Sequence, residues 1–354
     1  MSEAPVVVAV DAGGADLGPA EVAAGAALAA EQGARVLLFG DAASIGPVPA
    51  GVEVVDAPLS IAKAAHATAA VRSNPNASIV QATRAVASGR AQALVTAGST
   101  GSALAASLFV IKRGRGIYRP ALALPLPIPD HPVTLLDVGA NAEARREHLV
   151  QFAFMGAALS HAVLGIERPR VALLSNGEEE EKGREVVKEV HHELRTRTVD
   201  SLTFIGNVEG SDITAGLADV IVTDGFTGNV ALKLMEGVSQ ALLGAIRSAA
   251  MSSPRGKVGG LLLRPALGDL RTQLDPEGQG GAYLLGLRQL GVVPHGRFTR
   301  HGFAQAILRA ERGVREDVVG RTHRALELAG ALKISPMSAA EAPASAPDAS
   351  VRAS

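Results

Sequence analysis

Short apolar runs alternate along this chain with longer segments rich in Ala and Leu, and turns rich in Gly, Asn, Asp or Ser separate them. A parallel strand that is buried on both faces is continuously apolar, and a crossover helix must connect it to its neighbour. The alternation therefore predicts successive strand–helix–strand units. We expect strands at 6–10, 36–39, 93–96, 133–138, 171–174, 202–205 and 220–223.

Helices are expected between these strands, where the Ala- and Leu-rich segments lie. Their predicted bounds are 19–31, 61–72, 102–110, 147–164, 183–194, 230–250 and 314–329. Hydrophobic residues make up 47% of the 354 residues but aromatic residues only 3%, so aliphatic side chains must fill the core. The expected fold is a single three-layer α/β/α catalytic domain with a mainly parallel sheet, which spans residues 1–333.

Two segments break the alternation. Residues 236–275 are predicted to form a helical hairpin insertion, in which Leu261, Leu262 and Leu263 lie between basic residues. This mixture suits either a hairpin buried at a subunit interface or a tip that dips into an anionic lipid surface, and we favour the interface or an ordinary core. Residues 334–354 are rich in Ala, Pro and Ser and are expected to be a disordered tail.

The charge balance and the lack of cysteine exclude several classes of protein. Lys and Arg total 34 and Asp and Glu total 35, so the formal net charge is −1 and we expect no nucleic-acid binding. Without cysteine there is no disulfide, thiolate metal site or acylated enzyme thiol. The start of the chain lacks signal-peptide features, and no run of about 20 apolar residues occurs. We expect a cytoplasmic protein that at most lies on a membrane surface.

The turns that follow the predicted strands hold most of the candidate functional residues. In an open parallel sheet these turns leave one edge, where ligands bind. Glycine lets the backbone approach a ligand, and a helix N-terminus directs free N–H groups at an anion. The turns lie at 11–16, 97–101, 137–141, 175–178, 206–210 and 224–229, and 294–296 is a seventh candidate.

Two of these turns, 98–101 and 225–229, are the best candidates for anion binding, because each directly precedes a predicted helix. Lys233 lies one helical turn beyond Asn229, where its charge would neutralise an anion. Lys182 is a more modest candidate, since a cation near a helix N-terminus is otherwise unfavourable.

Each feature also has a purely structural interpretation. A single Gly-rich turn is more often a plain connection, and Asp11, Asp137 and Asp224 are each candidates for helix caps. The acidic run 178–181 is interpreted mainly as a solvated helix start, and His191 and His192 as solvent-facing.

Motifs for several familiar chemistries are missing. The sequence has no G-x-S-x-G, G-x-x-x-x-G-K-[ST] or H-E-x-x-H motif, no clean G-x-G-x-x-G and no metal-ligand spacing. We therefore predict no metal and no cofactor. A site of anion-binding turns without an enzyme nucleophile suggests that phosphate itself is a reactant.

Taken in order, the turns resemble those of the phosphate acyltransferases of bacterial phospholipid synthesis, over roughly residues 5–330. The matching motifs are D-A-x-G-x-D, L-V-T-A-G-S-T-G, L-L-D-V-G-A-N, E-H-L-V-Q-F-A-x-M-G, F-I-G-N-V-E-G-x-D-I and D-G-F-T-G-N-V-A-L-K. The resemblance implies a fold similar to isocitrate dehydrogenase-like and phosphotransacetylase-like proteins. It implies reversible transfer of a fatty acyl group from acyl carrier protein to inorganic phosphate, which gives an acyl phosphate for glycerol-3-phosphate acyltransferase. It further implies a homodimer and peripheral contact with the inner face of the membrane.

The site residues expected on this basis fall into three sets. Phosphate binding is assigned to Gly98, Ser99, Thr100, Gly101 and Gly228. The catalytic set is Lys233, Asn229, Lys182 and His295, with His295 either donating a proton to the leaving thiol or serving only in the structure. Substrate binding is assigned to Asp11, Gly14, Asn141, Asn207 and Asp224.

The sequence departs from the family pattern at Gly13, Ala15, Ser99, Tyr283, Arg297 and Phe298. These positions bear on the acyl-chain preference and on the role of His295. Two alternatives to a phosphate acyltransferase stay open, namely a dehydrogenase or phosphotransacetylase of the same architecture and a non-catalytic relative that scaffolds lipid-synthesis enzymes at the membrane.

Overall fold

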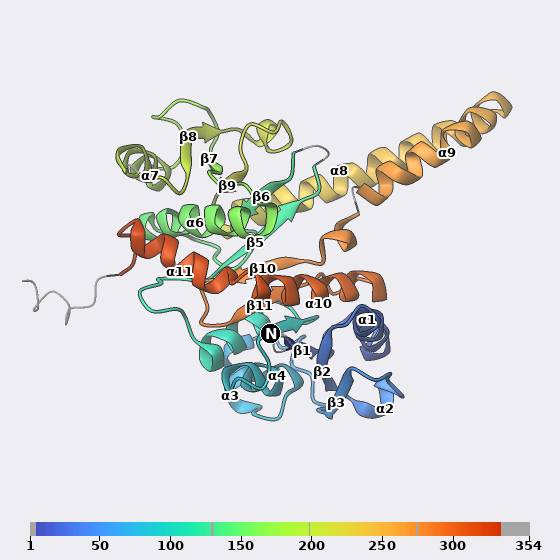
Figure 1. Ribbon diagram of the computed structural model, residues 1–354. Coiled ribbons are helices and arrows are strands. Elements are labelled where there is room, and N and C mark those ends of the chain that lie inside the picture. The colour runs from blue at the N-terminus through green and yellow to red at the C-terminus, as the bar shows by residue number, and fades with distance from the viewer. Residues whose placement is uncertain (1–4, 129–130, 198, 274, 334–354) are drawn as a thin grey trace, which may run out of the picture.

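The computed structural model describes residues 5–128, 131–197, 199–273 and 275–333. The predicted tail, 334–354, lies outside the described residues, so its disorder stays a prediction. In the described part, eleven strands form one sheet in the order β3-β2-β1-β4-β11-β10-β5-β6-β9-β7-β8 (Figure 1). The strands are β1 (Val7–Asp11), β2 (Arg35–Gly40), β3 (Val52–Asp56), β4 (Ala93–Thr96), β5 (Ala121–Leu126), β6 (Val133–Leu136), β7 (Arg170–Leu174), β8 (Thr203–Val208), β9 (Val220–Val222), β10 (Ala282–Leu285) and β11 (Leu290–Val293).

The sheet reverses direction in its middle. β10 pairs antiparallel with both β11 and β5, and β5 pairs antiparallel with β6. The first strand group, β3, β2, β1, β4 and β11, is parallel within itself, and so is the second strand group, β6, β9, β7 and β8. Because three antiparallel pairings separate them, the two groups run in opposite directions.

The expectation that all strand-following turns leave one edge is therefore wrong. Turns after the first strand group and turns after the second leave opposite edges of the sheet. The sequence conceals this reversal because β5 and β10 are almost completely buried, and a buried antiparallel strand shows the same continuous apolar run as a parallel one.

The described helices are α1 (Pro19–Glu31), α2 (Ala42–Ile45), α3 (Ala67–Ser73), α4 (Ser78–Ala87), α5 (Thr100–Ala106), α6 (Arg146–Leu159), α7 (Glu185–Thr196), α8 (Gly225–Met251), α9 (Pro254–Gln273), α10 (Arg300–Arg315) and α11 (Val318–Leu328). Single π turns extend α5 through Ser107–Ile111 and α6 through Ser160–Leu164. α1 has the predicted bounds. The helix expected at 61–72 begins only at Ala67, and the Ile61 carbonyl accepts hydrogen bonds from the Ala64 amide in a turn and from the Ser102 hydroxyl of α5.

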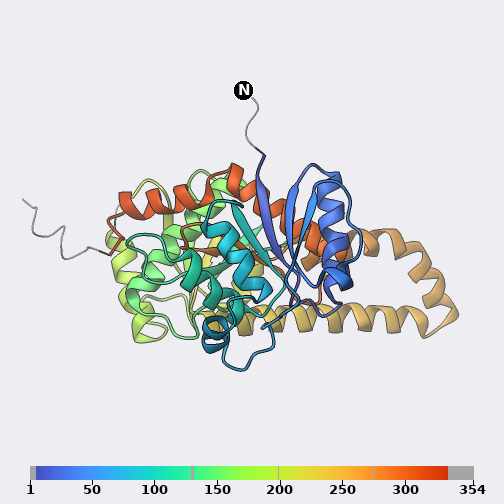
Figure 2. The same cartoon turned by 90° about the horizontal axis from the view of Figure 1, so that it is seen from below.

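Helices cover both faces of the sheet, as Figure 2 shows from below. Alternate residues of β1 point to opposite faces: Val8 and Val10 belong to one aliphatic cluster and Ala9 to another. The first cluster includes side chains of α1, α6, α7, α10 and α11, and the second includes side chains of α4 and the start of α8. The predicted three-layer α/β/α fold with a mainly parallel sheet is confirmed, and aliphatic residues fill most of its core.

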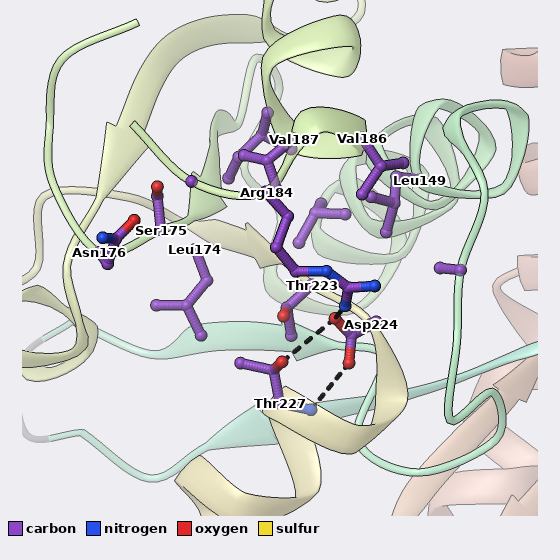
Figure 3. Close-up of a pocket in the computed structure, with 14 residues that line it drawn as sticks. Leu149, Leu174, Ser175, Asn176, Arg184, Val186, Val187, Thr223, Asp224 and Thr227 are labelled. Atoms are coloured by element: carbon purple, nitrogen blue, oxygen red, sulfur yellow. Dashed lines mark hydrogen bonds and ion pairs between the residues drawn. The ribbon is translucent and has the colours of Figure 1, made fainter. Parts of the chain in front are cut away.

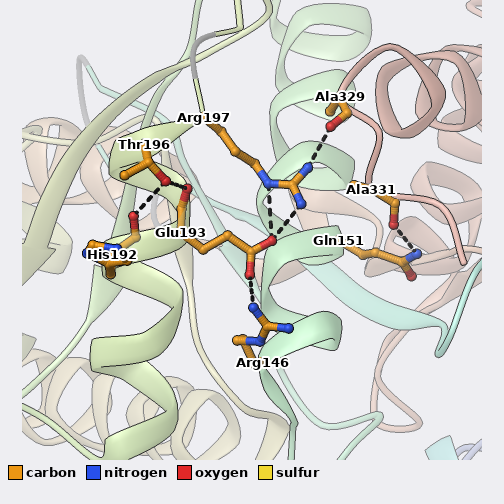
Figure 4. Close-up of polar contacts among 8 residues, drawn as sticks. All are labelled: Arg146, Gln151, His192, Glu193, Thr196, Arg197, Ala329 and Ala331. Carbon is orange, nitrogen blue, oxygen red and sulfur yellow. Dashed lines mark hydrogen bonds and ion pairs between the residues drawn. The ribbon is translucent and has the colours of Figure 1, made fainter. Parts of the chain in front are cut away.

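Polar contacts connect the end of the last helix to the helices of the second strand group (Figure 4). The Glu193 carboxylate of α7 accepts hydrogen bonds from Arg146 at 2.7 Å and from Arg197 at 2.6 Å. The Arg197 guanidinium also donates to the Ala329 carbonyl, just beyond α11, at 2.6 Å. The chain end of the described region is thus held beside α6 and α7, although it follows α10 on the first strand group.

α8 and α9 form a helical hairpin that projects away from the body (Figures 1 and 2). α8 has 27 residues, of which only Gly225 and Gly228 are buried. The predicted insertion, 236–275, covers most of this hairpin. At its outer part Leu261, Leu262 and Leu263 are 67%, 76% and 57% exposed. Among the described helices, none combines the length and apolar character needed to cross a bilayer.

Candidate functional site

The turns after β1 and β4 lie against each other at the edge of the first strand group. Asp11 is buried, and its carboxylate accepts hydrogen bonds from the Thr96 hydroxyl at 2.8 Å and the Gly13 amide at 3.0 Å. A Cβ atom at Gly14 would lie 2.4 Å from Gly98 Cα, so this close approach requires glycine. Burial raises the pKa of Asp11, although its hydrogen bonds act in the opposite direction. Asp11 and Gly14 therefore join two turns.

The first anion-binding candidate, 98–101, only partly precedes α5, because the helix begins at Thr100 and not at the predicted position 102. Ser99 is exposed and is the N-cap residue, and its hydroxyl accepts a hydrogen bond from the Ser102 amide at 3.3 Å. One donor of the helix N-terminus is thus already satisfied by the chain itself. Gly98 is buried, whereas Thr100 and Gly101 reach the surface.

At the opposite edge, Asp137 organises the turn after β6. This buried carboxylate accepts hydrogen bonds from the amides of Leu122, Gly139, Ala140 and Asn141 at 2.8–3.0 Å, and from the Asn141 side chain at 2.8 Å. Burial raises the pKa of Asp137, while these hydrogen bonds lower it. The Asn141 side-chain amide also donates to a backbone carbonyl at 2.8 Å. Asn141 therefore supports the turn.

The glycines of the second candidate, 225–229, are explained by packing. A Cβ atom at Gly228 would lie 2.0 Å from the Asp137 carbonyl oxygen, and one at Gly225 would lie 2.6 Å from the Asn141 oxygen. The start of α8 is therefore pressed against the 137–141 turn. Asn229 lies beside this turn, since its Cβ is 3.9 Å from a Cβ built on Gly139.

Asp224 caps α8, which confirms the cap interpretation for this aspartate. Its carboxylate accepts hydrogen bonds from the Thr227 amide at 2.8 Å and the Thr227 hydroxyl at 3.1 Å, and it pairs with Arg184 at 3.0 Å (Figure 3). The helix N-terminus is thus occupied by the protein's own carboxylate. The sequence-based interpretation selected Lys182, but it is Arg184 that reaches this position.

A cavity of about 490 Å³ lies at the same edge, between the starts of α7 and α8 and the side of α6 (Figure 3). Its apolar wall comes from Leu149, Leu173, Leu174, Val186, Val187 and Val222. Its polar lining includes Ser175, Asn176, Arg184, Asp224 and Thr227, so it unites the predicted turns 175–178 and 224–229. The Ser175 hydroxyl is buried and has no hydrogen-bond partner in the described part of the chain.

Asn207 lies apart from this cavity. Its side-chain oxygen is 3.1 Å from His191 Nδ1, and its amide donates to the Glu179 carbonyl at 2.8 Å. The expectation that His191 faces solvent is wrong: the ring is buried against Phe204, because the inner face of α7 includes position 191. His192 is exposed as expected. Lys182 is also exposed, in the segment that precedes α7.

One group of side chains connects the two strand groups. Lys233, on α8, places its Nζ 3.2 Å from Nε2 of His295, which follows β11. Glu236 accepts hydrogen bonds from Lys233 at 2.9 Å and from Arg297 at 3.2 Å, both at Oε2. We call Lys233, Glu236, His295 and Arg297 the Lys233 cluster. Burial, and then the charges of Lys233 and Arg297, lower the pKa of His295.

The predicted site residues thus form two clusters and a connection between them. One cluster holds Asp11, Gly14 and 98–101, and the other holds Asn141, Asp224, Gly228 and Asn229. Lys233 and His295 make the connection. Lys182 and Asn207 belong neither to these clusters nor to the connection. Sequence reasoning missed Glu236 and treated Arg297 only as a departure from the family pattern. The i, i+3 spacing of Lys233 and Glu236 on one helix was an available signal.

Within the described residues, no group of three or more His, Cys, Asp and Glu side chains is arranged to hold a metal ion. The groups gathered at the site are charged side chains, an imidazole, hydroxyls and backbone amides.

Comparisons with known proteins give consistent matches. A family model described as "Fatty acid synthesis protein" matches residues 6–321. A protein of Pelotomaculum thermopropionicum named phosphate acyltransferase is 43% identical over 321 residues, covering 89% of this chain and 92% of the relative. One of Thermobifida fusca with the same name is 44% identical over 315 residues, covering 87% of each chain.

Among solved structures, a phosphotransacetylase from Streptococcus pyogenes matches with a TM-score of 0.60 at 16% identity, over 88% of this chain and 94% of that one. The EutD phosphotransacetylase from Staphylococcus aureus matches with a TM-score of 0.55, also at 16% identity, over 87% of this chain and 94% of that one. At this level of identity the two likenesses concern the fold alone, and they confirm the predicted phosphotransacetylase-like architecture.

Proposed function

This chain belongs to the phosphate acyltransferase family, and we propose that it transfers a fatty acyl group from acyl carrier protein to inorganic phosphate. Membership makes the chain an acyltransferase, whereas the carrier protein as donor is part of the proposal. The product is an acyl phosphate, which a glycerol-3-phosphate acyltransferase consumes in the synthesis of phosphatidic acid. The transfer is reversible, because thioester and acyl phosphate are both activated acyl groups.

The proposed reaction exchanges one bond for another at the thioester carbonyl carbon. An oxygen of hydrogen phosphate attacks this carbon, a tetrahedral intermediate carries the negative charge on oxygen, and the carbon–sulfur bond breaks. The hydroxyl proton of hydrogen phosphate ends on the sulfur. A thiol has a pKa near 8.5, so its anion leaves without a strong acid. The main demand on the protein is therefore for donors that hold phosphate and stabilise the oxyanion.

The contact between Lys233 and His295 is the observation that carries this proposal. It brings a lysine of the second strand group to a histidine of the first, beside the turns that the family resemblance singled out. Lys233 is 47% exposed, so its ammonium group is accessible to a ligand from solution. No covalent enzyme intermediate is required, which agrees with a chain that has no cysteine.

The structure changes the role we propose for His295. The sequence-based hypothesis has this residue donate a proton to the leaving thiol. Its lowered pKa keeps the ring neutral at pH 7, and a neutral imidazole is a poor acid. We propose that His295 instead donates a hydrogen bond through a ring N–H, as a neutral electrophile that polarises the reacting group.

The test is an assay of the purified protein with palmitoyl-acyl carrier protein and inorganic phosphate, in which acyl phosphate is trapped with hydroxylamine. We expect acyl hydroxamate that depends on both substrates. A parallel reaction with acetyl coenzyme A identifies a phosphotransacetylase by its product. If neither donor yields an acyl phosphate, the proposed enzyme activity is refuted, and the result supports the alternative of a non-catalytic scaffold.

The proposal includes a homodimer in the cytoplasm with peripheral contact to the inner face of the membrane. The hairpin of α8 and α9 supports it, because an apolar row on α8 reaches solvent: Leu234, Val238 and Leu242 are 64%, 56% and 60% exposed. Such a row needs a partner surface. The basic residues Arg255, Lys257 and Arg264 beside the exposed leucines of α9 suit an anionic lipid surface.

A further inference from the structure

We infer that Lys233 and Arg297 form one binding site for inorganic phosphate beside His295, and that Glu236 is the positioning residue that holds both cations there. The inference deepens the proposed function and rests on it for the identity of the anion. It moves the phosphate from the Gly-rich turns, where the sequence suggested it, to a set of side chains between the two strand groups.

The turn at 295–298 fixes where Arg297 can reach. The Phe298 amide donates to the His295 carbonyl at 3.0 Å, which closes the turn. The Phe298 ring is buried and lies 6.5 Å from the Phe303 ring of α10. With Phe298 anchored in the core, Arg297 is left on the outer side of the turn, where its guanidinium meets Glu236 of α8.

The four side chains of the Lys233 cluster carry a net positive charge among themselves. Lys233 and Arg297 carry two positive charges, Glu236 carries one negative charge, and the His295 ring is neutral because its pKa is lowered. The exposed Asp16 carboxylate acts on His295 from outside the cluster, beside Gly296. The side chains of Lys233 and Arg297 are 47% and 46% exposed, whereas that of Glu236 is 15% exposed. The cations therefore face solvent in front of a carboxylate that holds them, which is the arrangement of an anion site.

The donors of the cluster also outnumber its acceptors. A guanidinium has five N–H donors and an ammonium three. In the described part of the chain, the Arg297 side chain makes one hydrogen bond, to Glu236, and Lys233 donates to the same Glu236 oxygen. Phosphate oxygens supply the acceptors that are missing, and arginine suits them because its donors lie in a planar fork.

Both ring nitrogens of His295 face donors. The Arg297 amide donates towards Nδ1 at 3.3 Å, and the Lys233 ammonium lies 3.2 Å from Nε2. A neutral imidazole has one acceptor nitrogen and one N–H, so in either tautomer one of these contacts places two donors together. A phosphate oxygen beside the Lys233 ammonium supplies the acceptor that this arrangement lacks.

The protein itself partly satisfies the two predicted anion-binding turns. Asp224 caps the N-terminus of α8 with its own carboxylate, and a second anion there would be repelled. The Ser99 hydroxyl takes one donor of the N-terminus of α5. At the Lys233 cluster, by contrast, two cations share one carboxylate oxygen and keep donors that have no acceptor among the described residues.

Calorimetric titration of the full chain with inorganic phosphate tests the inference without any need for activity. We expect Arg297→Gln to weaken phosphate binding roughly tenfold to a hundredfold, as the loss of charge-assisted hydrogen bonds implies. Arg297→Lys keeps the charge and should restore part of the affinity. Arg247→Gln is the matched control, because it removes the same charge from an exposed position on α8. Arg247 lies about 21 Å beyond Lys233 along that helix. Equal binding by wild type, Arg297→Gln and Arg247→Gln would overturn the inference.

Glu236→Gln separates positioning from simple electrostatics. Removal of a negative charge alone should tighten phosphate binding, whereas loss of the carboxylate that holds both cations should weaken it. We expect weaker binding and a higher KM for phosphate, with an unchanged melting temperature. Tighter binding would refute the positioning role. If wild type binds phosphate through Arg297 but forms no acyl phosphate from the carrier-protein thioester, the proposed function fails while this site stands.

Discussion

Asp137 holds a whole turn in shape with one buried carboxylate. Its five hydrogen bonds reach four amides and one side chain, and the start of α8 rests on the same turn. An asparagine at this position has one acceptor oxygen and two N–H donors, which would face other donors.

We therefore expect Asp137→Asn to lower the free energy of unfolding by about 2–4 kcal/mol, because buried amides lose their acceptor. Urea denaturation followed by circular dichroism measures the change. Asp41→Asn is the control, since Asp41 caps a short surface helix and asparagine caps equally well. An Asp137→Asn loss no larger than the Asp41→Asn loss would contradict this account.

His295 predicts a pH effect with a definite sign. Its folded pKa is lowered, first by burial and then by Lys233 and Arg297, while Glu236 and Asp16 act in the opposite direction. The stability contributed by the neutral ring is present above the unfolded pKa, near 6.5, and is lost as the pH falls from there through the lower folded pKa.

Lys233→Ala removes one of the two cations, so the pKa of His295 should rise while burial still holds it below its ordinary value. An NMR titration of the histidine ring protons measures the change, with His295→Gln used to assign the signal. Turnover should fall far more than stability does. If the pKa of His295 stays the same in Lys233→Ala, the two side chains do not interact in solution.

Residue roles were only partly predictable from sequence. Lys233 and His295 were selected from spacing and resemblance, and the structure brings them together. Arg184 and Arg297 were not selected, because arginines on exposed turns are common and their partners, Asp224 and Glu236, lie 40 and 61 positions away. Long-range pairing of this kind leaves no local pattern in a single sequence.

At the scale of elements, α8 has two different kinds of glycine. Gly228 touches the 137–141 turn, where a Cβ atom would lie 2.0 Å from the Asp137 oxygen, whereas nothing lies within 4 Å of a Cβ on Gly237. One glycine is required by packing and the other only weakens the helix.

The same substitution should therefore act in opposite directions on one helix. Gly228→Ala should destabilise the protein by more than about 1 kcal/mol, as expected when a buried contact is overpacked. Gly237→Ala should stabilise it by about 0.5–1 kcal/mol, the propensity difference between the two residues. Thermal unfolding monitored by circular dichroism compares the variants. Destabilisation by Gly237→Ala would show that another surface covers α8 there.

The leucines of α9 allow a direct test of membrane contact. Changing Leu261, Leu262 and Leu263 to Ser should abolish flotation with vesicles that contain anionic lipid, if this part of the hairpin enters the lipid surface. Leu328→Ser is the matched control, because Leu328 is 85% exposed on α11 in the body of the molecule. Unaltered flotation of the triple variant would remove the lipid contact from the proposal.

Element boundaries show what periodicity can and cannot reveal. α1 and the strands that were proposed lie close to their predicted places, since most of their residues are apolar. The helix expected at 314–329 is instead the end of α10 and the whole of α11, separated at Asp317, whose φ is 50°. The sequence has no Gly or Pro at 315–317, so no breaker residue marked the break.

At the scale of the whole molecule, the fold class was predictable and the strand directions were not. Alternating apolar runs indicate buried strands, but they carry no sign of direction when both faces are covered. The missed strands β3, β5, β10 and β11 include the ones that reverse the sheet. As a result, the predicted single edge of ligand-binding turns became two opposite edges joined by side chains of α8 and of the turn after β11.

The first stretch of α8, residues 225–233, sets the position of Lys233 between these two edges. It packs against the 137–141 turn at Gly225 and Gly228, and it places Lys233 about 12 Å from Gly225, the first residue of the helix. One residue inserted in this stretch would swing the lysine by about 100° around the helix and away from His295, since α-helices have 3.6 residues per turn. Length variation among natural or engineered relatives should accordingly be tolerated in the outer hairpin and absent from residues 225–233.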